Sequence, residues 1–210
     1  PFIVGVRRDQ GFHQLITEYF FYYNWQSGLL TPWLATGYEY NEDYTSITVH
    51  LRKGVKWSDG EPFTADDVVF TYEMLLENAP RLDHSADVAG FVDEVVEIDD
   101  YTVEIKLKSP NLRFHLSWAF PTVAIWGGLP IVPKHIWKDV DPLTYKNSPP
   151  VFTGPYELVS ASETTFTYKR RDDWWGWDVL GIRPAPEYVI YTWYGPEETR
   201  AIKMAGHELD

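Results

Sequence analysis

The chain has 210 residues, and its 31 acidic and 18 basic side chains give a formal net charge of −13. A hydrophobic content of 44% excludes an intrinsically disordered chain, and the acidity argues against nucleic acid as a partner, since phosphate binding needs clustered Lys and Arg. Cysteine is absent, which excludes disulfides, thiolate metal sites and a cysteine nucleophile, and no run of 18 apolar residues predicts a transmembrane helix.

The first 60 residues are expected to form strands and turns around one short helix. Residues 2–6 are typical of a strand and residues 13–19 of a short helix. An aromatic run over residues 19–23 leads into a turn at residues 24–28. From residue 45 to residue 51 apolar and polar side chains alternate, which predicts a half-buried strand.

The clearest element is a helix predicted over residues 65–78. Thr64 stands at its N-cap and Asp67 at the third helical position, the spacing of a capping box. Asp66 and Asp67 also favour the positive end of the helix dipole. Paired carboxylates suggest acid–base chemistry, but capping explains these two more simply.

The second half of the chain is expected to mix strands and short helices. A hairpin of strands 92–98 and 101–107 turns at Asp99–Asp100, and short helices and loops follow over 109–150. A second hairpin over 156–170 turns near 161–162. A strand over 187–193 is followed by a helix that begins at Pro196 and ends before Gly206. The strands are not spaced as regular βαβ units, so the fold class is mixed α and β.

Motifs that bind phosphate, dinucleotides or catalytic zinc do not occur in the sequence, and neither does a serine nucleophile elbow. Asp83, His84 and Asp87 form a histidine–carboxylate trio, which we interpret as a solvated loop and not as a metal site. No metal or cofactor is therefore predicted. The remaining histidines that we considered are interpreted as structural: His115, His135 and His207.

Asp172 and Asp173 lie beside Trp174, as in a glycosidase carboxylate pair flanked by a sugar-stacking ring. Adjacent residues seldom hold two carboxyl groups at the roughly 5–9 Å separation that glycoside hydrolysis needs. The preceding Arg170 and Arg171 offer local ion pairs instead. A carbohydrate-active enzyme stays an alternative, but the sequence favours a protein that is not an enzyme.

Residues 51–72 read LRKGVKWSDGEPFTADDVVFTY, and this stretch resembles the signature of the family 5 extracellular solute-binding proteins, the peptide, nickel and oligosaccharide receptors of ABC importers. Four further segments resemble family elements in the same order. They are Pro32–Ala35, Thr153–Tyr156, Arg171–Gly176 and Glu197–Asp210. The resemblance covers nearly the whole chain from about Tyr19. The signature contains structural turn and cap residues, so it indicates the fold strongly and the ligand weakly.

The resemblance implies a two-lobed fold of the type II periplasmic-binding-protein class, with the C-terminal lobe missing from this chain. Residues 1–31 and 146–210 are then expected to form a partial, discontinuous domain I, and residues 32–145 a smaller domain II. Family members are usually much longer, so a third domain is expected beyond residue 210. A chain without that domain is expected to bind ligand weakly, because closure of two lobes supplies most of the buried contact.

The resemblance also implies a receptor that captures an oligopeptide or oligosaccharide by lobe closure and delivers it to an ABC permease, whose ATPase is a separate partner. The ligand-binding residues that we predict are Tyr23, Asn24, Trp25, Trp126 and Gly127. The implied location is outside the cytoplasmic membrane, in the periplasm or as a membrane-anchored lipoprotein. A sensing or chaperone receptor on the same scaffold stays a further alternative.

The ten tryptophans are the unusual feature of the composition, and they admit two interpretations. Four lie in the family's structural motifs and favour a core role: Trp33, Trp57, Trp174 and Trp175. The others form the pool from which ligand-stacking rings are expected: Trp25, Trp118, Trp126, Trp137, Trp177 and Trp193.

Overall fold

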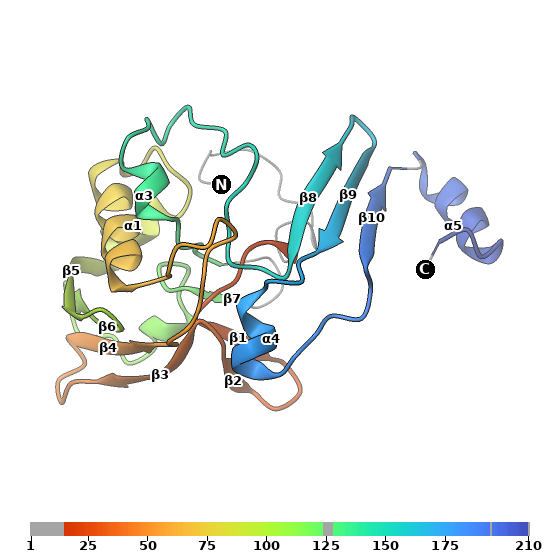
Figure 1. Ribbon diagram of the computed structural model, residues 1–210. Coiled ribbons are helices and arrows are strands. Elements are labelled where there is room, and N and C mark those ends of the chain that lie inside the picture. The colour runs from red at the N-terminus through yellow and green to blue at the C-terminus, as the bar shows by residue number, and fades with distance from the viewer. Residues whose placement is uncertain (1–14, 124–127, 194, 210) are drawn as a thin grey trace.

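The computed structural model describes residues 15–123, 128–193 and 195–209. These residues form three small sheets, with strand orders β3-β4-β6-β5, β2-β1-β7 and β10-β9-β8. In Figure 1 the four-stranded sheet and helix α1 lie on the left, strands β8 to β10 lie on the right, and β1, β2 and β7 lie between them. The mixed α and β class predicted from the sequence is confirmed.

The four-stranded sheet is antiparallel throughout. It comprises β3 (Ala35–Tyr40), β4 (Ser46–Leu51), β5 (Val92–Asp99) and β6 (Thr102–Leu107). The predicted alternation holds, since the apolar residues of β4 and β6 are buried: Ile47, Val49, Leu51, Val103, Ile105 and Leu107.

The turn between β5 and β6 comes one residue later than predicted. Asp99 pairs with Thr102, so Asp100 and Tyr101 form the two-residue connection. Asp99 Oδ1 accepts the backbone N–H of Tyr101 at 2.8 Å, and this contact closes the turn with Asp99 still in the strand.

Helix α1 (Ala65–Glu77) covers this sheet and carries the predicted capping box between Thr64 and Asp67. On its buried face Val68 and Leu75 are fully buried, whereas Val69 and Leu76 are only partly buried. The face is set by contacts with β5, β6, α2 and α3, which the spacing of apolar residues alone does not specify.

Helix α2 (Ser85–Phe91) replaces the solvated loop predicted around Asp83, His84 and Asp87. That prediction was wrong because His84 and Ser85 are buried beneath the end of α1 and the β5 strand. Among the described residues, no group of three His, Asp or Glu side chains is placed to hold a metal ion.

The central sheet joins β1 (Phe21–Asn24) to β2 (Leu29–Pro32) as a hairpin and to β7 (Thr122–Val123) as a parallel neighbour. The predicted turn at residues 24–28 lies in this hairpin. The predicted helix over 13–19 is wrong for the described part, because residues 17–19 have no helical structure and are buried. Residues 2–6 lie outside the described residues.

The third sheet is antiparallel and comprises β8 (Tyr156–Ala161), β9 (Thr165–Arg170) and β10 (Tyr188–Thr192), as predicted within one or two residues at each end. Between β9 and β10 lies α4 (Trp175–Leu180), which begins inside the tryptophan cluster. Helix α5 (Glu197–Ala205) follows β10 and has no buried residue. The shorter elements of the chain are η2 (Phe114–Leu116) and α3 (Lys134–Trp137).

One continuous apolar core runs from β4, β6 and α1 through Phe20 and Phe21 of the central sheet to Trp174 and Trp175 at the start of α4. In the part of the chain that the structure describes, no helix is both long and apolar enough to cross a bilayer.

Candidate functional site

The tip of the β1–β2 hairpin presents an exposed aromatic pair. Trp25 is 64% exposed, and its ring meets Tyr23 edge-on with 5.0 Å between the ring centroids. Tyr23 itself is half-buried, so it supports Trp25 from below. An indole ring held in this way offers a rigid, flat, apolar face with an N–H at its edge, a surface suited to a sugar ring or an apolar peptide side chain.

Asn24 fixes the turn that displays this pair. Its Oδ1 accepts the backbone N–H groups of Gln26 at 2.9 Å and Ser27 at 3.1 Å, and its carbonyl accepts the N–H of Gly28 at 2.8 Å. Gly28 has a φ of +70°, a left-handed conformation that favours glycine. Asn24 therefore has a structural function in the loop, whatever else it contacts.

Trp126 and Gly127 lie outside the described residues. The strand that precedes them, β7, runs parallel to β1 and pairs Val123 with Tyr22, one residue before Tyr23. The structure thus brings the described end of β7 beside the hairpin. Tyr23, Asn24 and Trp25 lie together in the hairpin, and a ligand-binding role stays a prediction for all five residues.

The remaining tryptophans divide by burial. The four that the sequence assigned to structural motifs pack in or against the core, with Trp57, Trp174 and Trp175 at most 3% exposed. Trp137 leaves the ligand-stacking pool because it is 2% exposed and packs against Tyr145. The exposed members of the pool are Trp25, Trp118, Trp177 and Trp193.

A buried carboxylate that sequence reasoning missed lies next to this hairpin. Glu18 is 3% exposed, and it accepts the indole N–H of Trp33 on Oε1 and that of Trp175 on Oε2, each at 2.8 Å. Trp33 also packs edge-on against Tyr22, with 5.2 Å between the ring centroids. No spacing rule predicts this site, because one partner is 15 residues away in the sequence and the other 157.

The surroundings of Glu18 act on its ionisation in opposite directions. Burial raises the pKa of its carboxyl group from 4.5 to about 7, because the charged form loses its hydration. The two indole donors and the guanidinium of Arg171 oppose that rise. Glu18 and burial together raise the pKa of Tyr22 well above 10, so this phenol stays neutral.

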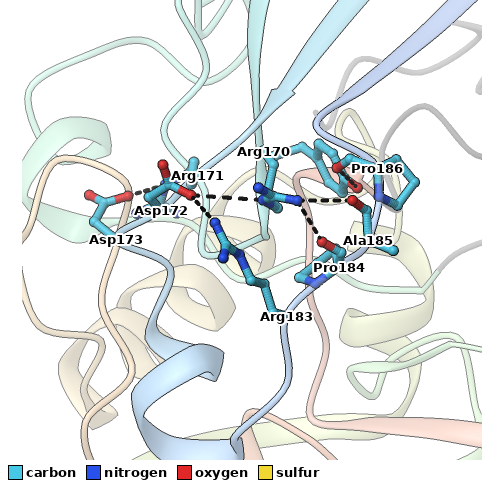
Figure 2. Close-up of polar contacts among 9 residues, drawn as sticks. Arg170, Arg171, Asp172, Asp173, Arg183, Pro184, Ala185 and Pro186 are labelled. Atoms are coloured by element: carbon cyan, nitrogen blue, oxygen red, sulfur yellow. Dashed lines mark hydrogen bonds and ion pairs between the residues drawn. The ribbon is translucent and has the colours of Figure 1, made fainter.

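The carboxylates beside the tryptophan cluster are engaged in ion pairs (Figure 2). Arg171 Nε lies 3.2 Å from Asp173 Oδ1, and Asp172 Oδ1 lies 3.0 Å from Arg183 and 3.8 Å from Arg170 Nε. The predicted local ion pairs are confirmed. Arg170 also donates to the carbonyls of residues 184 and 185, which anchors the segment leading to β10.

A polar hollow of about 390 Å³ lies at the N-terminal end of α1, and two of the basic side chains that line it have acidic partners within the chain. Lys134 contacts Asp66, and His135 Nε2 lies 2.7 Å from Asp59 Oδ2. These contacts give His135 a structural partner. His115 has one as well, since its Nδ1 lies 2.9 Å from the Tyr40 hydroxyl.

Comparison with solved structures places the chain in a known architecture. The periplasmic oligopeptide-binding protein of an oligopeptide ABC transporter from Thermotoga maritima, solved with mannohexaose bound, matches with a TM-score of 0.82 and 30% identity, covering 94% of this chain and 35% of that one. NikA from Brucella suis, solved with Fe(III)-EDTA, matches with a TM-score of 0.78 and 26% identity, covering 100% of this chain and 41% of NikA. The fold is therefore that of the two-lobed periplasmic binding proteins, of which this chain covers a part.

The sequence comparison identifies the family. A model of the bacterial extracellular solute-binding proteins, family 5, matches residues 30–210, and the chain belongs to that family. It is 34% identical over 176 residues to the probable peptide-binding protein YejA of Agrobacterium fabrum, covering 79% of this chain and 27% of YejA. The chain thus spans between about a quarter and two-fifths of the length of these relatives.

Proposed function

We propose that this chain is part of an extracytoplasmic receptor that captures an oligopeptide or oligosaccharide by lobe closure and delivers it to an ABC permease. The observation that carries the proposal is the exposed Trp25 ring, which packs on half-buried Tyr23 at a turn that Asn24 closes with hydrogen bonds. The family membership supports it, since the matching proteins are named for binding and not for catalysis.

We infer the same lobes that the sequence suggests. Residues 1–31 and 146–210 form the partial domain I, residues 32–145 form domain II, and a third domain follows. Trp33 and Leu34 connect β2 of the central sheet to β3 of the four-stranded sheet, so a lobe boundary near residue 32 coincides with a change of sheet. The receptor works in the periplasm or as a membrane-anchored lipoprotein.

The ligand class is the open part of this proposal. The Thermotoga maritima protein carries an oligopeptide-binding name and was solved with mannohexaose bound, so both ligand classes are connected with one similar protein. An indole face stacks equally well on the apolar face of a sugar ring and on an apolar peptide side chain.

Calorimetry on the full-length protein tests the proposal. Mannohexaose, a cello-oligosaccharide and a nonapeptide are titrated separately, and we expect saturable binding of at least one of them. A chromogenic glycoside incubated in parallel is expected to stay intact. Hydrolysis of the glycoside together with no binding of any probe would overturn the receptor in favour of a carbohydrate-active enzyme.

A further inference from the structure

Glu18 lies where three sheets meet. Trp33, one of its donors, stands between β2 of the central sheet and β3 of the four-stranded sheet. Trp175, the other donor, is the first residue of α4, which follows β9 of the third sheet in the chain. Trp175 also shares its N–H with the carbonyl of Thr153, which lies three residues before β8.

The geometry makes one carboxylate the common acceptor for these segments. Each of its oxygens takes one indole donor at 2.8 Å, so neither tryptophan can shift without breaking a bond to Glu18. The two indoles also touch each other edge-on, with 6.2 Å between the ring centroids. Trp174 stacks on Trp33 at 6.3 Å, which closes the cluster.

A buried carboxylate is a costly way to join three segments if packing is the only requirement. Desolvation of the charge offsets much of what its hydrogen bonds contribute, and an apolar side chain of similar volume is often as stable. A carboxylate differs from an apolar side chain in one respect. It can gain or lose a proton, and its two protonation states accept hydrogen bonds differently. In the ionised state both oxygens are strong acceptors, whereas protonation turns one of them into a hydroxyl, which accepts poorly.

We propose that Glu18 is a positioning residue that sets the arrangement of the sheets on either side of the β1–β2 hairpin. Gain or loss of its proton changes this arrangement. The inference rests on the proposed function in one respect, which is that the arrangement of the lobes governs ligand capture. Ionised Glu18 holds Trp33 and Trp175 together, and protonated Glu18 releases one of them.

The charged and titratable groups that face Glu18 among the described residues are few. Arg171 is the cation near it, and this guanidinium also pairs with Asp173 and donates to the carbonyl of Gly154 at 2.9 Å. Tyr22 interacts electrostatically with both Glu18 and Tyr19, and its own phenol stays neutral. The pKa of the Glu18 carboxyl, about 7, puts its proton exchange in the neutral range.

The experiment measures the distance between two spin labels in the full-length protein. The labels are attached at Glu77→Cys, at the exposed end of α1, and at Ser160→Cys, on the exposed edge of β8. The 210 residues contain no other cysteine. Distance distributions are recorded roughly two units below and above pH 7. We expect a narrower distribution at the higher pH, with a midpoint near 7.

Glu18→Gln removes the charge change and keeps the shape, so its distribution is expected to be broad at both pH values. Glu163→Gln, an exposed carboxyl in the β8–β9 turn, is the matched control and should behave as the wild type. An unchanged wild-type distribution across this range, or the same transition in Glu18→Gln, would overturn the proposal.

Trp33→Phe keeps the test decisive if Glu18→Gln does not fold. It removes one N–H donor and retains a ring, so the distribution should be broader than wild type even at high pH, and the midpoint should move above 7 because the lost donor lowers the pKa of Glu18. A wild-type width in this variant contradicts the positioning role. Titration of mannohexaose and the nonapeptide at both pH values separates the two proposals: a pH transition without binding of either probe contradicts the receptor and leaves the effect of Glu18 standing.

Discussion

Trp57 donates its indole N–H to Asp67, with 3.1 Å between Trp57 Nε1 and Asp67 Oδ2. The same carboxylate accepts the backbone N–H of Thr64 at 3.0 Å and that of Lys134 at 2.9 Å. Asp67 is 5% exposed, so its oxygens are fully occupied by protein donors. The Asp67 side chain therefore links three segments by hydrogen bonds: the family signature turn, the N-terminus of α1 and the start of α3.

Replacement of Asp67 by Ala is therefore expected to be strongly destabilising. One buried and two partly buried donors lose their acceptor, and the free energy of unfolding should fall by on the order of 3–5 kcal/mol. Asp66→Ala is the matched control, because this neighbour is 52% exposed and its pair with Lys134 contributes at most about 1 kcal/mol. Urea unfolding followed by tryptophan fluorescence measures both. Equal losses in the two variants would contradict this account of the signature.

The stability of the protein should depend on pH through Glu18. Its pKa is about 7 in the folded chain against an ordinary 4.5, so folding favours the protonated form. This contribution is fully present below about pH 4.5 and is lost as the pH rises through 7, with a total change of up to about 3 kcal/mol. Glu18→Gln should lack this component in urea unfolding curves recorded across the range. The prediction fails if the variant loses as much stability as the wild type does.

Arg171 should matter both for stability and for this pH dependence. Its guanidinium is buried, donates to the Gly154 carbonyl and lowers the pKa of Glu18. Arg171→Met is expected to cost roughly 2–4 kcal/mol and to move the Glu18 midpoint above 7. Arg183→Met, whose ion pair with Asp172 is exposed, should cost about 1 kcal/mol or less and leave the midpoint in place. A fixed midpoint in Arg171→Met would show that the two groups are not coupled.

Trp25 is expected to contribute to binding and not to stability. Because it is 64% exposed, Trp25→Ala should change the free energy of unfolding by no more than about 0.5 kcal/mol. The affinity for whichever of mannohexaose or the nonapeptide the full-length protein binds should fall at least about tenfold. Leu112→Ala, 57% exposed in another part of the chain, is the control and should bind as the wild type does. Wild-type affinity in Trp25→Ala would remove the hairpin tip from the binding site.

Local sequence determines much of this fold. The capped helix α1, the alternating strands β4 and β6 and the turn over residues 24–28 depend on neighbours within a few positions, which is why they can be predicted from spacing and cap chemistry. The ion pairs of Asp172 and Asp173 are also local, since Arg170 and Arg171 precede them directly. The resemblance over residues 51–72 predicts the family, and the family model that matches residues 30–210 confirms it.

The tertiary structure alone decides the rest. Strand β7 is two residues long and exists only because it pairs with β1, and α2 is stabilised by the elements that cover it. Trp137 is buried and Trp25 is exposed, although the sequence analysis placed both among the candidate ligand-stacking tryptophans. Glu18 shows the physical reason most clearly: its donors are 15 and 157 residues away, and only a packed chain brings such distant groups within 2.8 Å of one carboxylate.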